Sequence, residues 1–292
     1  MSRLKETLTK GEFVVTGEIA PPKGVNIQKC IGEAEKYLKG RVCAVNVTDN
    51  QSAVVKAGSL VTCHLLAKEG MEPVFQMTCR DRNRLAIQSD LLSAWALGIE
   101  NVLCITGDHT YLGDHPEANP VFDLDSVQLV KTVTGLNEGH DLSGHELEGK
   151  PGFFAGAVVT PAFDPVEAQI IKMKKKIDAG AKFFQTQAVY QPERFEDFMN
   201  KVEDFGVPVL AGIVVIKSAG MASFMNENVA GISVPDEIVS EMADTKKEDR
   251  KKKAVEISAR IIRKIKPMCQ GIHIMTLGWE ALLPDIIKEA EL

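Results

Sequence analysis

The chain has 292 residues, of which 45% are hydrophobic and 25% are charged, and its formal net charge is −6. This length and apolar content allow a sizeable core. The acidic balance argues against a general nucleic-acid or anionic-membrane binder, because such proteins need a basic surface. The one dense basic run, 246–253, includes acidic residues and is interpreted as the solvated face of a helix.

The lack of a targeting signal in the sequence and the pattern of its cysteines lead us to expect a cytoplasmic protein. No apolar run approaches the ~18 residues of a membrane span, and the first residues lack the apolar region of a signal peptide. The six cysteines contain no C-x-x-C pair, so we expect free thiols, and no metal or iron–sulfur site is predicted. Any electrons that this chain handles must therefore arrive by another carrier.

Short apolar runs alternate with longer amphipathic stretches along the whole chain. The predicted strands are 13–20, 42–48, 73–79, 101–106, 153–160, 182–187, 208–215 and 271–277. The predicted helices are 26–39, 52–69, 82–97, 125–137, 165–179, 192–205, 218–229, 235–265 and 279–291. Eight such units without a linker predict one domain over 1–292, an α/β fold of the (β/α)₈ TIM-barrel class.

Three stretches depart from the regular alternation. The segments 107–124 and 137–152 are rich in Gly, Asp, His and Pro, and long loops of a barrel are usually functional or mobile. The stretch 235–265 is longer than one barrel helix requires, so we expect an additional helix within it.

In such a barrel the active site forms at the carboxyl ends of the strands. Polar residues that close an apolar strand are therefore the candidates, because a core strand has no packing reason to carry them. At least six of the eight predicted strands end in such residues, which favours a ligand pocket at one rim.

Glu18 is the strongest single candidate. It lies inside an apolar run and directly precedes Ile19, Ala20 and two prolines. A carboxyl group buried without a partner is expected to be held protonated, which suits a general acid. The alternative is a structural ion pair with a lysine of the barrel.

Three further side chains are candidates for ligand contacts. Asp108 follows a glycine at a strand exit, where the pair forms either a simple turn or a site carboxylate. Gln185 and Gln187 share one face of their strand, and Gln187 could offer a donor and an acceptor to a heterocycle edge. The alternative for both glutamines is a polar rim position.

Other common motifs are missing from the sequence. No G-x-G-x-x-G or P-loop pattern indicates a Rossmann-type nucleotide site or an NTPase, and the six histidines show no ligand spacing. Four lysines crowd the helix predicted over 165–179, and one of them could reach a cofactor phosphate. The residues alone thus predict a barrel enzyme that binds a planar polar ligand.

The same residues resemble the methylenetetrahydrofolate reductase family, with matching order and spacing over essentially the whole chain. The matching pieces are GEIAPPK, VNVTDN, MTC, ITGD, MKKKIDAGAKFFQTQ and AGIVV. The resemblance implies a flavin at the strand ends, FAD or alternatively FMN. It also implies hydride transfer from the flavin to methylenetetrahydrofolate, which gives 5-methyltetrahydrofolate.

The resemblance assigns roles residue by residue. Glu18 matches the general acid that helps to open the folate imidazolidine ring, and Asp108 matches the aspartate beside flavin and folate. Gln187 matches a folate-contacting glutamine. The positions that match flavin contacts are Thr48, Asp49, Gln51, Gln76, Thr106, Gly107, Asp108, Thr160, Gln169, Lys175 and Lys176.

Several positions depart from the family pattern. Thr106 replaces the usual arginine, Gln76 a histidine and Gln169 an aspartate of the bacterial type, and Ala219 replaces a phenylalanine that stacks on nicotinamide or folate. With these changes the sequence resembles the reductase subunits of anaerobic one-carbon pathways. The implied electron source is NAD(P)H or a partner subunit that relays electrons, in an oligomer or hetero-complex.

Two other function classes compete with this interpretation. The first is a folate-binding barrel of the methyltransferase class, which passes a methyl group to a corrinoid without redox chemistry. The second is a non-catalytic subunit that keeps the barrel as a docking surface. The joint presence of Glu18, Asp108 and Gln187 argues against the second, because a scaffold gains nothing from a buried acid.

Overall fold

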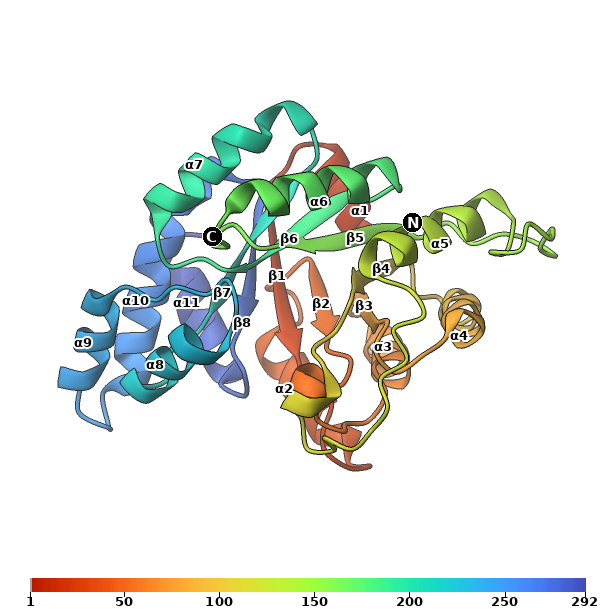
Figure 1. The fold of residues 1–292 in the computed structure, drawn as a ribbon. Helices are drawn as coiled ribbons and strands as arrows, with labels where there is room; N and C mark the ends of the chain where they lie inside the picture. The colour runs from red at the N-terminus through yellow and green to blue at the C-terminus, as the bar shows by residue number, and fades with distance from the viewer. Residues whose placement is uncertain (1) are drawn as a thin grey trace.

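Eight apolar segments of four to six residues form parallel strands, each paired with the next and the last with the first (Figure 1). The computed structural model describes residues 2–292. The strands are β1 (Val14–Ile19), β2 (Ala44–Val47), β3 (Pro73–Thr78), β4 (Asn101–Ile105), β5 (Phe154–Val159), β6 (Phe183–Ala188), β7 (Val209–Val214) and β8 (Gly271–Met275). The predicted single-domain (β/α)₈ barrel is confirmed.

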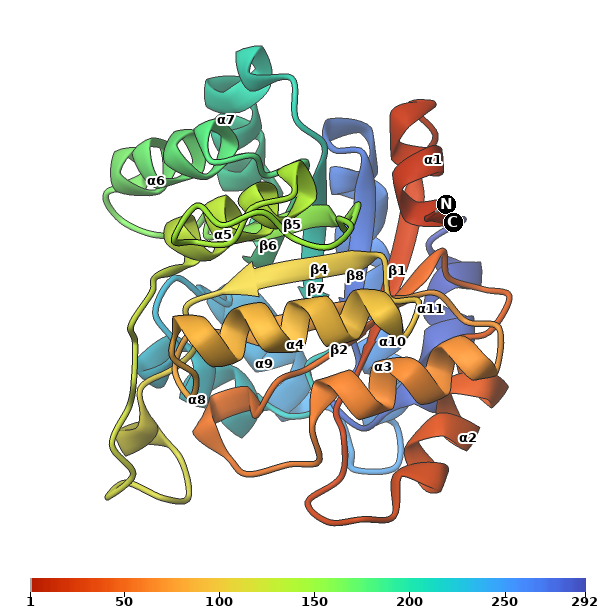
Figure 2. The ribbon, with the colours of Figure 1, turned by 90° about the vertical axis from the view of Figure 1, so that its right-hand side faces the viewer.

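Helices cover the outside of this barrel, and Figure 2 shows α3 and α4 side by side on one flank. The helices are α1 (Arg3–Thr9), α2 (Ile27–Tyr37), α3 (Ser59–Lys68), α4 (Arg84–Ala96), α5 (Ser126–Glu138), α6 (Val166–Asp178), α7 (Pro192–Val202), α8 (Ala219–Asn228), α9 (Asp236–Asp244), α10 (Arg250–Ile265) and α11 (Leu283–Glu289). The expected additional helix is present, because 235–265 divides into α9 and α10. Within residues 2–292, no helix combines the length and apolar character needed to cross a membrane.

The helix predicted over 52–69 begins later than expected. Only Ser59–Lys68 is α-helical, because Asn50, Ser52 and Ala53 adopt left-handed backbone conformations that interrupt a helix. The Asn50 side chain accepts a hydrogen bond from the backbone N–H of Lys56, which closes this segment into a loop. The loop therefore lies at the carboxyl end of β2, beside the mouth of the barrel.

The barrel interior changes from apolar to polar along the strands, because every second side chain of a strand points inward. The amino-terminal layer consists of Val14, Ala44, Val74, Leu103, Phe154, Phe183 and Leu210. The layers above it carry buried polar side chains, which include Thr16, Glu18, Asn46, Gln76, Gln185 and His273. One end of the interior therefore stabilises the fold, and the other end is equipped for chemistry.

The amino-terminal end of the barrel is closed by α1, a helix that the sequence pattern did not predict. Leu4 and Leu8 of α1 pack on the apolar layer, and Leu4 is 0% exposed. Glu72 accepts a 2.9 Å hydrogen bond from the backbone N–H of Leu4, and the Ser2 hydroxyl caps the helix at the N–H of Lys5. The helix thus acts as a plug held by both packing and hydrogen bonds.

The substitution Leu4→Ala tests this plug. We expect the free energy of unfolding to fall by about 2–5 kcal/mol, because the side chain is fully buried and its loss leaves a cavity. Urea denaturation followed by circular dichroism measures the change. Leu85→Ala serves as the control, since Leu85 is 74% exposed and its removal should cost less than ~0.5 kcal/mol. Equal effects of the two substitutions would show that α1 does not close the barrel.

Candidate active site

A cavity of about 360 Å³ opens among the carboxyl ends of the strands. This volume lies within the range of ~300–1,000 Å³ typical of small-molecule sites. The sequence-predicted residues that line it are Glu18, Asp49, Gln51, Gln76, Thr106, Gly107, Asp108, Thr160, Gln169, Lys176 and Gln187. Surface grooves of larger volume involve the outer helices and lie away from the carboxyl ends of the strands. The structure therefore brings Glu18, Asp108 and Gln187 to one cavity.

Glu18 reaches this cavity from inside β1 and is only 7% exposed. The amide nitrogen of Gln76 donates a 2.9 Å hydrogen bond to Glu18 Oε2, and His273 Nε2 lies 3.5 Å from the same oxygen. Neither oxygen contacts a lysine, so the alternative of an ion pair with a barrel lysine is not what the structure shows. Glu18 Oε1 makes no hydrogen bond within residues 2–292 and is the oxygen left for a ligand.

His273 is a site residue that sequence reasoning did not select, although it lines the cavity. Its Nδ1 atom lies 2.9 Å from the hydroxyl of Thr16, and both side chains are buried. When the Thr16 hydroxyl donates to Nδ1, the proton of the neutral ring is on Nε2 and faces Glu18. The signal for His273 was a polar residue inside the apolar run of β8.

A pair of amides lies across the interior between β2 and β6. The Asn46 amide donates to Gln185 Oε1 at 2.7 Å, and the Gln185 amide donates back to Asn46 Oδ1 at 3.2 Å. Because each amide satisfies the other, this pair is stable in the barrel interior without a charge. Gln185 therefore contributes a neutral wall of the cavity, while Gln187 two residues later retains more hydrogen-bonding capacity.

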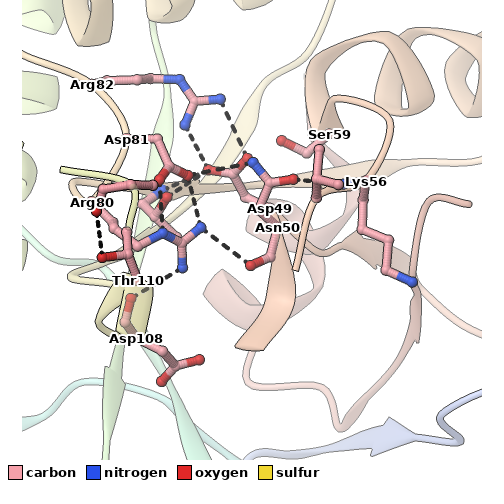
Figure 3. Close-up of polar contacts among 12 residues, drawn as sticks. Asp49, Asn50, Lys56, Ser59, Arg80, Asp81, Arg82, Asp108 and Thr110 are labelled. Atoms are coloured by element: carbon pink, nitrogen blue, oxygen red, sulfur yellow. Dashed lines mark hydrogen bonds and ion pairs between the residues drawn. The ribbon is translucent and has the colours of Figure 1, made fainter. Parts of the chain in front are cut away.

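Asp49 lines the cavity, but its carboxylate is occupied by the protein itself (Figure 3). Its Oδ2 accepts 2.9 Å hydrogen bonds from the backbone N–H and the hydroxyl of Thr78, and Arg82 donates to both carboxylate oxygens at 2.7 and 3.3 Å. Arg82 in turn donates to Asp90 on α4. Asp49 thus fixes the end of β2 to the end of β3, whatever contact it also makes with a ligand.

The segment 106–108 places a carboxylate on the cavity rim. Gly107 has φ +91°, and a Cβ atom there would lie 3.0 Å from Thr78 Cβ, so glycine is required. The Thr106 hydroxyl accepts a hydrogen bond from the N–H of Ser126 at the start of α5. The Asp108 carboxylate is exposed and makes no hydrogen bond or ion pair within residues 2–292. It is therefore available to a ligand.

The opposite wall is uncharged apart from its lysines. Gln187 accepts a hydrogen bond from the N–H of Ala188, which leaves its amide donors unpaired. The side chains of Thr160 and Gln169 have no hydrogen-bond partner among the described residues. These groups supply donors and acceptors suited to the edge of a heterocycle.

The lysines of α6 divide according to helix geometry. Gln169, Lys172 and Lys176 line the cavity, as residues three, four and seven apart share one face of a helix. Lys175 falls on a different face and is exposed, outside the cavity lining. Helix periodicity could have favoured Lys172 over Lys175 from the sequence alone.

Two predicted contact residues have distinctive surroundings. Thr48, at the end of β2, is buried outside the cavity lining, and its hydroxyl oxygen has no hydrogen-bond partner in the described chain. Lys176 is 6% exposed and donates a 2.6 Å hydrogen bond to the carbonyl oxygen of Val158. Burial, together with the nearby charge of Lys172, lowers the pKa of Lys176 to about 8.

Comparison with known proteins places these features in a family context. The family model described as methylenetetrahydrofolate reductase matches residues 3–291. Methylenetetrahydrofolate reductase 2 of Schizosaccharomyces pombe is 28% identical over 228 residues, which cover 74% of this chain and 35% of that protein. The 5,10-methylenetetrahydrofolate reductase of Pectobacterium carotovorum is 24% identical over 203 residues, which cover 68% and 62% of the two chains.

Among solved structures, the chain is similar to a protein from Clostridium thermocellum that binds two copies of 5-methyl-5,6,7,8-tetrahydrofolic acid. The TM-score is 0.66 at 16% sequence identity, with 99% of this chain and 98% of that chain covered. At this identity the likeness demonstrates the shared barrel fold. The matches to the curated relatives span less than two thirds of the S. pombe and P. carotovorum proteins.

The lowered pKa of Lys176 predicts a pH-dependent stability. Between pH 8 and 10.5 the unfolded chain binds more protons at this residue than the folded chain, so its contribution to stability rises with pH in that window. We expect the unfolding free energy of the ligand-free wild type, minus that of Lys176→Met, to rise by about 2 kcal/mol from pH 7.5 to pH 10. Urea titrations at both values measure it. The control is Lys174→Met at an exposed position, which should give a pH-independent difference; the same flat result for Lys176→Met would contradict the prediction.

Proposed function

Because the chain belongs to the methylenetetrahydrofolate reductase family, we propose that it reduces 5,10-methylenetetrahydrofolate to 5-methyltetrahydrofolate with a bound flavin. The observation that carries the proposal is the setting of Glu18, which has one oxygen fixed by Gln76 and the other unpaired at a ligand-sized cavity. A folate ligand in the similar C. thermocellum barrel supports the substrate class. The six free cysteines suit a reducing compartment, and we assign the protein to the cytoplasm.

The residues present fit a flavin. The cavity combines neutral hydrogen-bonding side chains that lack internal partners, such as Gln51, Thr160 and Gln169, with the cationic Lys172. Of the positions that match flavin contacts, the ones that line the cavity and that we propose to hold the cofactor are Asp49, Gln51, Gln76, Thr106, Gly107, Asp108, Thr160, Gln169 and Lys176, whereas Thr48 and Lys175 lie outside the cavity lining. FAD is the first assignment and FMN the alternative. The flavin, when bound, supplies the hydride.

The chain's own residues handle the proton and orient the substrate. Glu18 donates a proton to the ring nitrogen whose departure opens the imidazolidine ring of the substrate. Gln76 and His273 both address Glu18 Oε2, so they fix the carboxyl group while Oε1 faces the reaction. Asp108 accepts hydrogen bonds from the pterin side, and Gln187 donates its unpaired amide hydrogens to the same ligand.

The proposed source of electrons for the flavin is a partner subunit. No Phe, Tyr or Trp side chain lines the cavity in the described chain, and α8 begins with Ala219 where the family pattern has a stacking phenylalanine. A nicotinamide ring would therefore lack a large aromatic side chain to stack on in this cavity. This supports delivery of electrons through a partner subunit, so that the chain works in a hetero-complex. Direct reduction by NAD(P)H is the alternative.

The substitution Glu18→Gln tests the central assignment. It removes the acidic proton but keeps the shape of the side chain, so we expect folate reduction to fall by a factor of at least ~10² while bound flavin is retained. Single-turnover oxidation of the reduced enzyme by methylenetetrahydrofolate measures the step. Glu35→Gln, at an exposed position on α2, is the matched control and should leave the rate unchanged. Near-normal turnover in Glu18→Gln would falsify the general-acid role.

Cofactor extraction tests the redox chemistry and the electron source together. We expect a yellow protein from which FAD is released, with the flavin bleached by dithionite and recoloured by methylenetetrahydrofolate. NADH alone should bleach it slowly. A colourless protein that still binds 5-methyltetrahydrofolate would favour the methyltransferase alternative, and rapid bleaching by NADH would refute the need for a partner.

A further inference from the structure

Arg80 is a buried cation with an unusually complete set of partners. It lies two residues after β3, lines the cavity and has a side chain that is 2% exposed. Its guanidinium donates a two-pronged pair of hydrogen bonds to Asp81, at 2.8 and 2.7 Å. The same group donates 3.2 Å hydrogen bonds to the carbonyl oxygens of Asn50 and Asp108 (Figure 3).

These contacts join three consecutive strand ends. Asn50 follows β2, Arg80 follows β3 and Asp108 follows β4. Asn50 adopts a left-handed conformation at φ 44°, and its amide also donates to Asp81. The guanidinium of Arg80, in the loop after β3, thus connects the backbones of the loops after β2 and β4.

The long loop between β4 and α5 is held by Arg80 at two separated points. The guanidinium binds the carbonyl oxygen of Asp108 near the start of the loop, and the backbone carbonyl of Arg80 accepts a 2.7 Å hydrogen bond from the N–H of Val121. Figure 2 shows this segment, in yellow-green, extending from the body of the barrel. The Asp108 carboxylate has no partner of its own, so its position depends on this backbone.

The geometry of these contacts requires an arginine, and a lysine could not replace it. Two carbonyl oxygens and both oxygens of a carboxylate are bound at once, which matches the planar fork of a guanidinium and not the single point of a lysine ammonium. The Asp81 carboxylate neutralises the charge, so the effect of Arg80 on its surroundings is mainly geometric. Asp81 is partly exposed, so water can solvate it if Arg80 is removed.

We propose that Arg80 is a positioning residue that holds the Asp108 carboxylate at the cavity rim by fixing the loops after β2 and β4. The inference rests on the proposed function, because it gives Asp108 its role toward the folate. A displacement of about 1 Å at such a group can lower a rate by about 10²-fold. Arg80 therefore affects the reaction through Asp108 without donating a proton or hydride.

The experiment compares Arg80→Met, Arg80→Lys and the control Arg84→Met in the full chain. Arg84 pairs with Asp123 at the far end of the same loop, but it is exposed and lies outside the cavity. We expect kcat/KM for methylenetetrahydrofolate to fall about 10- to 100-fold in both Arg80 variants and to stay unchanged in Arg84→Met. The Kd of 5-methyltetrahydrofolate, measured by calorimetry, should rise in parallel.

Two readouts separate positioning from general loss of structure. In an Asp108→Asn background, Arg80→Met should have a much smaller effect than in the wild type, because the two residues act as one unit. Amide hydrogen exchange over 108–121 should accelerate in the Arg80 variants and not in Arg84→Met. Additive effects on kcat/KM, or unchanged exchange, would overturn the proposal.

The outcomes also separate this inference from the proposed function. A wild-type protein that neither binds nor reduces a folate would end the proposed function, and the exchange measurement would still decide whether Arg80 holds the loop. A wild type that reduces folate, together with normal kinetics in both Arg80 variants, would leave the function standing and overturn the inference.

Discussion

Side chains alternate along eight strands that share one interior, so a fixed half of each strand's side chains points into the barrel. Every inward polar group must find a partner across the barrel or a ligand at its mouth, because an unpaired buried polar group is costly. The Asn46–Gln185 amide pair and the Thr16–His273 contact satisfy this constraint within the protein. Glu18 Oε1 has no such partner among the described residues, and Glu18 lines the cavity at the carboxyl ends of the strands.

Two aspartates, one after β2 and one after β4, show how the same type of side chain serves different purposes. Asp49 is buried and bound by Thr78 and Arg82, so it mainly joins β2 to β3. Asp108 is exposed and unpaired, and its backbone is held by Arg80. Both follow apolar strands in the sequence. Only their surroundings separate a carboxylate that supports the rim from one that can bind a ligand.

The barrel and much of the cavity lining could be predicted because their signals are local. A short apolar run predicts a strand, and Glu18 is conspicuous as a charged residue inside such a run. His273 carried the same signal, but its meaning depends on Thr16, 257 residues away, across the closure of the barrel. Arg80 lies in a polar run where nothing marks it as buried. The seven residues of α1 were too few for their apolar pattern to stand out, and their role appears only once the barrel end is seen to need closing.

The cavity has two unlike walls, and their difference indicates how a ligand is held. The side built by the loops after β2, β3 and β4 is cross-linked by Arg80, Arg82 and their carboxylates, so a change in its shape breaks ion pairs in which one partner of each is buried. The facing side presents hydrogen-bonding groups that have no partner among the described residues, namely the side chains of Thr160 and Gln169 and the amide hydrogens of Gln187. A rigid wall can fix the orientation of a flat heterocycle, and an adaptable one can follow it between the oxidised and reduced shapes of a cofactor or between substrate and product. The proposed transfer of one hydride and one proton to the same ligand would use both properties in one cavity.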